Sequence, residues 1–121
     1  MILTGKLNST QYKAISYFDD ALSMPDCIVH IKFTKKIPTY GYTDVMDDWY
    51  EIVVASDIDE NEKIITIAHE MVHVKQFALG ELSIDGKTWK GSNDFTGEPW
   101  EDEAETLSRT LTEEFYASIR N

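Results

Sequence analysis

Residues 60–80 read Glu60-Asn-Glu-Lys-Ile-Ile-Thr-Ile-Ala-His-Glu-Met-Val-His-Val-Lys-Gln-Phe-Ala-Leu-Gly80. The spacing of the apolar residues predicts a helix that begins at Asp59 or Glu60 and ends at Leu79, with Gly80 just beyond it. This helix is apolar around most of its circumference, and its polar residues gather in one narrow strip: Thr66, His69, Glu70, His73 and Gln76. We therefore expect a mostly buried helix that presents a single polar strip.

Two further helices and three strands are expected around this central helix. The first helix covers residues 9–24 and is capped by Asn8 or Ser9, and the last helix begins near Pro99. β-rich stretches predict strands at 27–33, 40–46 and 49–55. The short turn between the last two strands makes them an antiparallel hairpin. These elements predict one α+β domain over residues 1–121, with a small mixed three-stranded sheet packed on helices.

The chain is strongly acidic. It has 121 residues, with 22 Asp and Glu against 11 Lys and Arg, and a formal charge of −11. This charge opposes binding to nucleic acid and to anionic membrane surfaces, so neither partner is expected. The first residues lack the apolar stretch of a secretory signal, and the single cysteine, Cys27, cannot form an internal disulfide. We therefore expect a cytoplasmic protein.

The segment from His69 to His73, His-Glu-Met-Val-His, carries the chemistry of the sequence. The two histidines lie one helical turn apart on one face, close enough to share a metal ion. Glu70 lies one residue round the helix, where its carboxylate can act on a water molecule at that ion. The same residues could instead be an ordinary surface group, with Glu70 paired to a lysine. An unpaired Glu on so apolar a helix would be costly to bury, which favours the metal site.

A third protein ligand is expected, because catalytic zinc usually has three. His30 is predicted to be a polar residue on a strand, and Cys27 a thiol in the core. No histidine follows His73, so the third ligand should be acidic. The acidic candidates near the start of the last helix are Asp94, Glu98, Glu101, Asp102, Glu103 and Glu105. These acidic residues also suit the N-terminal end of a helix dipole, and both roles can hold together.

The motif from His69 to His73 is the signature of the zincin metallopeptidases, which this chain resembles. Residues 99–105, Pro-Trp-Glu-Asp-Glu-Ala-Glu, are similar to the Glu-x-x-Ala-acidic stretch of the gluzincins. The resemblance implies that Glu101 is the third zinc ligand and that Glu105 orients a ligand. Glu103 is about 200° round the helix from Glu101 and is expected to point away.

The order of elements over residues 9–120 resembles the minimal, single-domain gluzincins of bacteria and their phages. That resemblance implies a minimal zincin-like fold and a zinc-dependent metallopeptidase with one zinc ion, in which Glu70 is the general base. The substrate would be a peptide or protein. In the family's topology the first strand of the hairpin forms the sheet edge, where it would pair antiparallel with an extended peptide. The implied substrate-binding residues are Tyr40, Gly41, Tyr42, Thr43 and Asp44.

Two other functions remain open from the sequence. A non-catalytic binding module stabilised by metal would keep the same ligands, but the presence of Glu70 argues against it. An accessory protein of a phage or mobile element would bind no stoichiometric metal.

Overall fold

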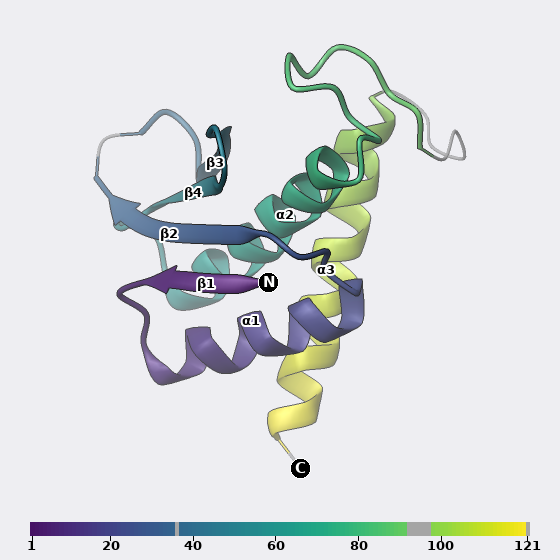
Figure 1. Ribbon diagram of the computed structural model, residues 1–121. Coiled ribbons are helices and arrows are strands. Elements are labelled where there is room, and N and C mark those ends of the chain that lie inside the picture. The colour runs from purple at the N-terminus through teal and green to yellow at the C-terminus, as the bar shows by residue number, and fades with distance from the viewer. Residues whose placement is uncertain (36, 92–97, 121) are drawn as a thin grey trace.

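Four strands and three helices make up the part of the chain that the structure, a computed structural model, describes: residues 1–35, 37–91 and 98–120. The elements are β1 (Ile2–Gly5), α1 (Ser9–Leu22), β2 (Ile28–Thr34), β3 (Gly41–Val45), β4 (Tyr50–Ala55), α2 (Glu60–Ala78) and α3 (Pro99–Ile119) (Figure 1). The expected combination of helices with a small mixed sheet is therefore confirmed.

The sheet has four strands in the order β1-β2-β4-β3, so the expected three strands were one too few. The missed strand is β1, which pairs parallel with β2 in the register Ile2 opposite Ile28. Its four residues are too short to show an alternating pattern. Its pairing partner lies 26 residues further along the chain in that register, and such a tertiary contact leaves no local signal.

The hairpin of β3 and β4 is antiparallel, as predicted. It closes at Met46, whose backbone N–H donates to the carbonyl of Trp49 at 2.9 Å. β4 also pairs parallel with β2, which leaves β3 as an edge strand of the sheet.

The predicted helices are confirmed, with ends set by their capping residues. Asn8 caps α1 in a capping box with Gln11, and Asp59 caps α2 by accepting a hydrogen bond from the backbone N–H of Glu62. Gly80 follows α2 with a φ of 72°, a left-handed conformation that glycine adopts without strain.

The core is formed where α1, α2 and α3 meet the sheet. α3 runs beside α2 (Figure 1), and Ala104 is fully buried in their contact. The small side chain of Ala104 lets the two helix backbones approach closely. The largest fully buried apolar side chains on the three helices are Phe18, Ile15, Ile64, Ile67, Met71 and Phe115. Within the described residues, no helix combines the length and the apolar character needed to cross a membrane.

Candidate metal centre

His69, His73 and Glu101 meet where α2 and the first turn of α3 come together. One ligand atom from each residue lies within 4.8 Å of the other two. The Nε2 atoms of the two histidines are 3.2 Å apart, and Glu101 reaches both, at 2.7 Å from His73 Nε2 and 3.5 Å from His69 Nε2. These three residues could hold a metal ion, and within the described residues they form the sole such group.

The carboxyl and imidazole groups of this cluster perturb one another. Hydrogen bonds from His69 and His73 hold the pKa of Glu101 far below its ordinary range. Burial acts to lower the pKa of His73, but the neighbouring Glu101 and Glu70 outweigh burial and raise it. Glu101 and His73 therefore stabilise each other's charged forms.

Glu70 lies beside the cluster on the buried side of the polar strip, and 6% of it is exposed. Its carboxylate accepts a hydrogen bond from the Thr43 hydroxyl on β3 at 2.9 Å. Burial raises the pKa of this carboxyl, against the opposing effects of His73, His69 and the Thr43 hydrogen bond. Thr43 thus links the substrate-binding strand expected from the sequence to the expected general base.

Gln76 fixes the orientation of His73. It is fully buried, and its side-chain oxygen lies 2.8 Å from His73 Nδ1. Its amide nitrogen donates to the carbonyl of Trp100 and to Glu103 Oε1, both at 3.0 Å. The side-chain oxygen of Gln76 can only accept a hydrogen bond, so His73 Nδ1 carries a hydrogen and donates to that oxygen. Nε2 of His73 is then the ring nitrogen that faces Glu101 and His69.

The position of Glu103 corrects the expectation that it points away from the site. Its carboxylate accepts a hydrogen bond from Gln76 of the polar strip on α2. α3 packs so closely on α2 that residues on two different faces of its first turns, Glu101 and Glu103, both reach that strip. Gln76 itself had a sequence signal, since it lies one turn beyond His73 in the same polar strip. What the sequence lacked was the location of its two partners on α3.

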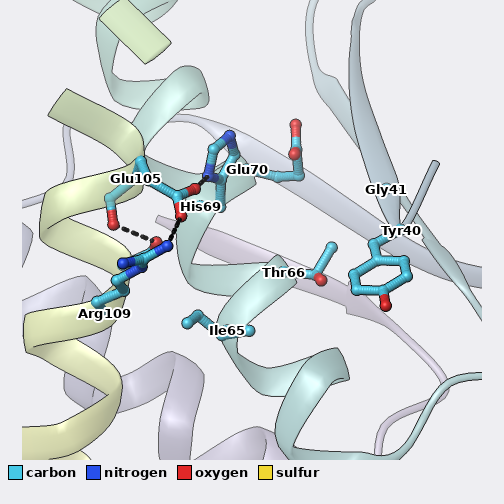
Figure 2. A pocket seen from close by; sticks show the side chains of 9 residues that line it. Tyr40, Gly41, Ile65, Thr66, His69, Glu70, Glu105 and Arg109 are labelled. Atoms are coloured by element: carbon cyan, nitrogen blue, oxygen red, sulfur yellow. Dashed lines mark hydrogen bonds and ion pairs between the residues drawn. The ribbon is translucent and has the colours of Figure 1, made fainter. Parts of the chain in front are cut away.

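Glu105 approaches the other nitrogen of His69 (Figure 2). Its Oε2 lies 3.6 Å from His69 Nδ1, while its Oε1 pairs with the guanidinium of Arg109 one turn further along α3. Arg109 was not foreseen at the site. This carboxylate lies between the second ring nitrogen of His69 and a guanidinium, a position suited to orient the His69 ring.

Two cavities open on either side of His69 and Glu70. One, of about 340 Å³, is lined by Tyr40 and Gly41 of the β3 end of the sheet, by α2 and by α3. The other, of about 430 Å³, is lined by Tyr42 and Thr43 together with apolar groups that include Phe77, Leu82 and Trp100. Asp44 is exposed on β3 and is not among the residues that line either cavity.

Successive residues of β3 direct their main-chain N–H and C=O groups alternately toward β4 and toward the open edge of the sheet. Tyr40 accepts a hydrogen bond from Ala55 of β4, and the same register places Tyr42 and Asp44 opposite Val53 and Glu51. These residues direct their N–H and C=O groups to β4. The alternate residues, Gly41, Thr43 and Val45, therefore direct theirs to the open edge.

Gly41 is required by the close approach of β3 to α2. A Cβ atom at this position would lie 2.6 Å from Cγ2 of Thr66 and 2.8 Å from the carbonyl oxygen of Val53. Any side chain here would push the edge strand away from the helix that carries the two histidines.

The remaining candidates lie apart from the cluster or outside the described residues. His30 hydrogen-bonds with Thr4 across β1 and β2, as a polar strand residue. Cys27 is partly buried against the core, and burial raises the pKa of its thiol. Glu98 and Asp102 flank the start of α3 without joining the group, and Asp94 lies outside the described residues.

No family model, curated protein or solved structure matches this chain.

Proposed function

We propose that this chain is a zinc-dependent metallopeptidase with His69, His73 and Glu101 as the protein ligands of one zinc ion. The observation that carries the proposal is the spacing of their ligand atoms. Zinc bonds of about 2.0–2.1 Å at tetrahedral angles place neighbouring ligand atoms about 3.3 Å apart. The two histidine Nε2 atoms are 3.2 Å apart, and the Glu101 carboxylate approaches them with its two oxygens, Oε1 at 2.7 Å from His73 and Oε2 at 3.5 Å from His69.

The chemistry of the donors also fits zinc. Two imidazoles and a carboxylate are the ligand set of several catalytic zinc sites, which keep a fourth position open. Zinc bound there would supply a Lewis acid that polarises a peptide carbonyl and makes a water molecule more acidic. Gln76 supports this set by holding His73 with Nε2 toward the other two ligands.

Glu70 is the proposed general base. Its carboxylate lies next to the ligands, and its raised pKa brings it closer to neutral pH, which favours proton transfer in both directions. Glu70 would take a proton from the attacking water and deliver it to the leaving amine. Thr43 orients the carboxylate through its hydroxyl.

The substrate is proposed to be an extended peptide bound along the open edge of β3. Gly41 and Thr43 offer N–H and C=O groups beside the two cavities, a geometry suited to adding one more strand to the sheet. The two cavities would take side chains on either side of the cleaved bond. This extends the sequence-based assignment of Tyr40 to Asp44 but shifts the main-chain contacts to the odd-numbered residues.

The decisive experiment combines metal analysis with digestion of a peptide library. The purified protein should contain one zinc ion per chain and cleave peptides, and removal of zinc with a chelator should stop cleavage. Glu70→Gln should keep the zinc and lose at least about 10²-fold in rate, the usual effect of removing a general base. Zinc without cleavage would instead identify a metal-stabilised binding module, and absence of zinc would contradict the site itself.

A further inference from the structure

The larger cavity beside the metal cluster, of about 430 Å³, is apolar away from the ligands. We call it the Trp100 cavity. Among the described residues that line it, the charged or imidazole side chains are those of the proposed zinc site: His69, Glu70, His73 and Glu101. Its remaining side walls are aromatic and aliphatic, and they are formed by Tyr42, Phe77, Leu82 and Trp100.

Two threonines in the lining of the Trp100 cavity already donate their hydroxyl hydrogens within the protein. The Thr39 hydroxyl donates to the carbonyl of Gly41 at 2.9 Å, and the Thr43 hydroxyl donates to Glu70 at 2.9 Å. Each hydroxyl has one hydrogen, so neither can donate to a substrate side chain at the same time. A charged side chain placed here would lose its water without an ion-pairing partner outside the zinc site, whereas a large apolar one would be stabilised by burial.

The turn that follows α2 holds the Leu82 wall in place. The backbone N–H groups of Glu81 and Leu82 both donate to the carbonyl of Gln76, at 2.9 and 3.1 Å. Leu82 pairs with Trp89 across the turn, and the ring of Trp89 packs against the ring of Trp100 with 6.3 Å between their centroids. Leu82 is only 4% exposed. The apolar wall is therefore formed before any substrate binds, as is usual for specific binding pockets.

The other cavity beside the cluster, of about 340 Å³, has a different character. It combines Tyr40 and Ile65 with the ion pair of Glu105 and Arg109 (Figure 2). A charged pair in the wall makes this cavity less suited to bury a large apolar side chain. The two sides of the cleaved bond should therefore differ in side-chain preference, with the apolar preference at the Trp100 cavity.

The direction of β3 determines which part of a substrate reaches the Trp100 cavity. Tyr40, just before β3, lines the other cavity, whereas Thr43 lines the Trp100 cavity. A peptide that pairs antiparallel with β3, as β4 does on the opposite side, has its N-terminal part at the Trp100 cavity. Antiparallel pairing is also slightly more stable per residue than parallel pairing. Because His73 and Glu101 line this cavity, the side chain that enters it belongs to a residue next to the cleaved bond.

We infer that the Trp100 cavity binds a large apolar side chain on the residue immediately before the cleaved bond, and that Phe77, Leu82 and Trp100 determine this preference. The substrates are thereby restricted to peptides with a residue such as leucine, methionine or phenylalanine at that position. The inference rests on the proposed peptidase function and adds its specificity.

The test varies one residue of the substrate and one residue of the cavity. Mass spectrometry of a peptide-library digest first identifies the residues on both sides of each cleaved bond. The best peptide is then made with leucine, phenylalanine, alanine or glutamate immediately before that bond, and kcat/KM is measured for each version. For wild-type protein the leucine and phenylalanine peptides should exceed the alanine peptide by about 10- to 100-fold, the usual effect of burying a large apolar side chain, and the glutamate peptide should be the poorest.

Phe77 is the position to change, because it is only half-buried and lies in the last turn of α2, where a lysine is compatible with the helix dipole. Phe77→Ala should reduce the preference for leucine over alanine by about 3- to 10-fold. Phe77→Lys should raise the glutamate peptide relative to the leucine peptide by at least about 10-fold, because it adds a cation to an apolar wall. The matched controls are Leu79→Ala and Leu79→Lys, since Leu79 is 53% exposed and lines neither cavity. They should leave the order of the four peptides unchanged.

The inference and the proposed function fail in different ways. Equal cleavage of the four peptides by wild-type protein, or an apolar preference only at the residue after the cleaved bond, overturns the inference and leaves the peptidase assignment standing. An unchanged preference in both Phe77 variants, at the zinc content of the wild type, also overturns the assignment of the cavity. If the wild-type protein cleaves no peptide, the proposed function is wrong and this inference falls with it.

Discussion

Nε2 of His73 and Oε1 of Glu101 lie 2.7 Å apart, across the contact between α2 and α3. The two residues are distant in sequence, and their meeting depends on the packing of one helix against the other. These atoms are also the ones that the proposed zinc site uses. Protons and zinc therefore compete for the same pair, since zinc binds the neutral imidazole.

The three acidic residues of α3 should differ in their effect on zinc affinity. Glu101→Ala removes one of three proposed ligands and should weaken zinc binding by more than about 100-fold. Glu105→Ala loosens His69 and should cost about 10–100-fold. Glu103→Ala acts through Gln76 and should cost less than Glu105→Ala.

Zinc titration against a competing chelator ranks these variants, with Glu113→Ala as a control on the same helix. If Glu105→Ala lost zinc while Glu101→Ala kept it, the assignment of the third ligand would be wrong. A loss of helical signal in any variant would show that the helix itself had been damaged, so far-ultraviolet circular dichroism accompanies each titration.

Replacing Gln76 tests whether its hydrogen bond orients the His73 ring. Gln76→Leu removes the acceptor for His73 Nδ1 and the amide group that donates to the carbonyl of Trp100 and to Glu103. Zinc affinity should fall by about 10–100-fold, and the free energy of unfolding by about 1–3 kcal/mol.

The specific readout for Gln76 is the tautomer of His73, measured by nitrogen NMR on the metal-free protein at a pH above the His73 pKa. The wild-type ring should carry its proton on Nδ1, and the variant should show a mixture of tautomers. An unchanged tautomer in Gln76→Leu would mean that another group orients the ring.

The sequence predicted most elements of the fold because their signals are local. Asn8, Asp59 and Gly80 mark helix ends through their own side chains or backbone, and the hairpin of β3 and β4 closes through a short turn. β1 was missed because a four-residue edge strand is defined by its partner β2 and not by its own pattern. The place of β1 in the sheet is a tertiary property.

The candidate site could be predicted only for the residues that lie together on one helix. His69, Glu70 and His73 share a face of α2 by helical periodicity alone. The contacts of Glu103 and Arg109 depend on how α3 crosses α2, which the sequence pattern does not define. The pairing of Thr43 with Glu70 likewise requires the position of β3 above the helix, which Gly41 makes possible.

Two substitutions at Thr43 separate the contribution of its backbone N–H to peptide binding from the contribution of its side-chain hydroxyl. Thr43→Val removes the hydroxyl that binds Glu70 but keeps the backbone N–H, whereas Thr43→Pro removes both. Thr43→Pro should therefore bind peptides about 3- to 10-fold more weakly than Thr43→Val, at equal zinc content. The measurement is KM for the best library peptide beside zinc analysis of each variant. Equal KM values would place the substrate away from this edge.

The stability of the metal-free protein should depend on pH through three groups of the cluster. The pKa of His73 is higher in the folded protein than its ordinary value of 6.5. His73 therefore contributes its full stabilisation below pH 6.5, and this contribution is lost as the pH rises through the pKa of His73 in the folded protein. The raised pKa of Glu70 acts in the same direction, from its ordinary value of 4.5 upward. Glu101 acts oppositely: its lowered pKa contributes stability above 4.5 that is lost as pH falls toward the folded value. Denaturant unfolding after chelation should thus show greatest stability near pH 4.5, a decline above that pH through Glu70, and a steeper decline above pH 6.5 where His73 also contributes. Glu70→Gln should flatten the decline, because the amide cannot ionise.

With saturating zinc the stability of the protein should instead rise with pH above about pH 6, since zinc binding requires the neutral imidazole. A metal-free protein that gained stability toward pH 8 would contradict the coupling of these groups.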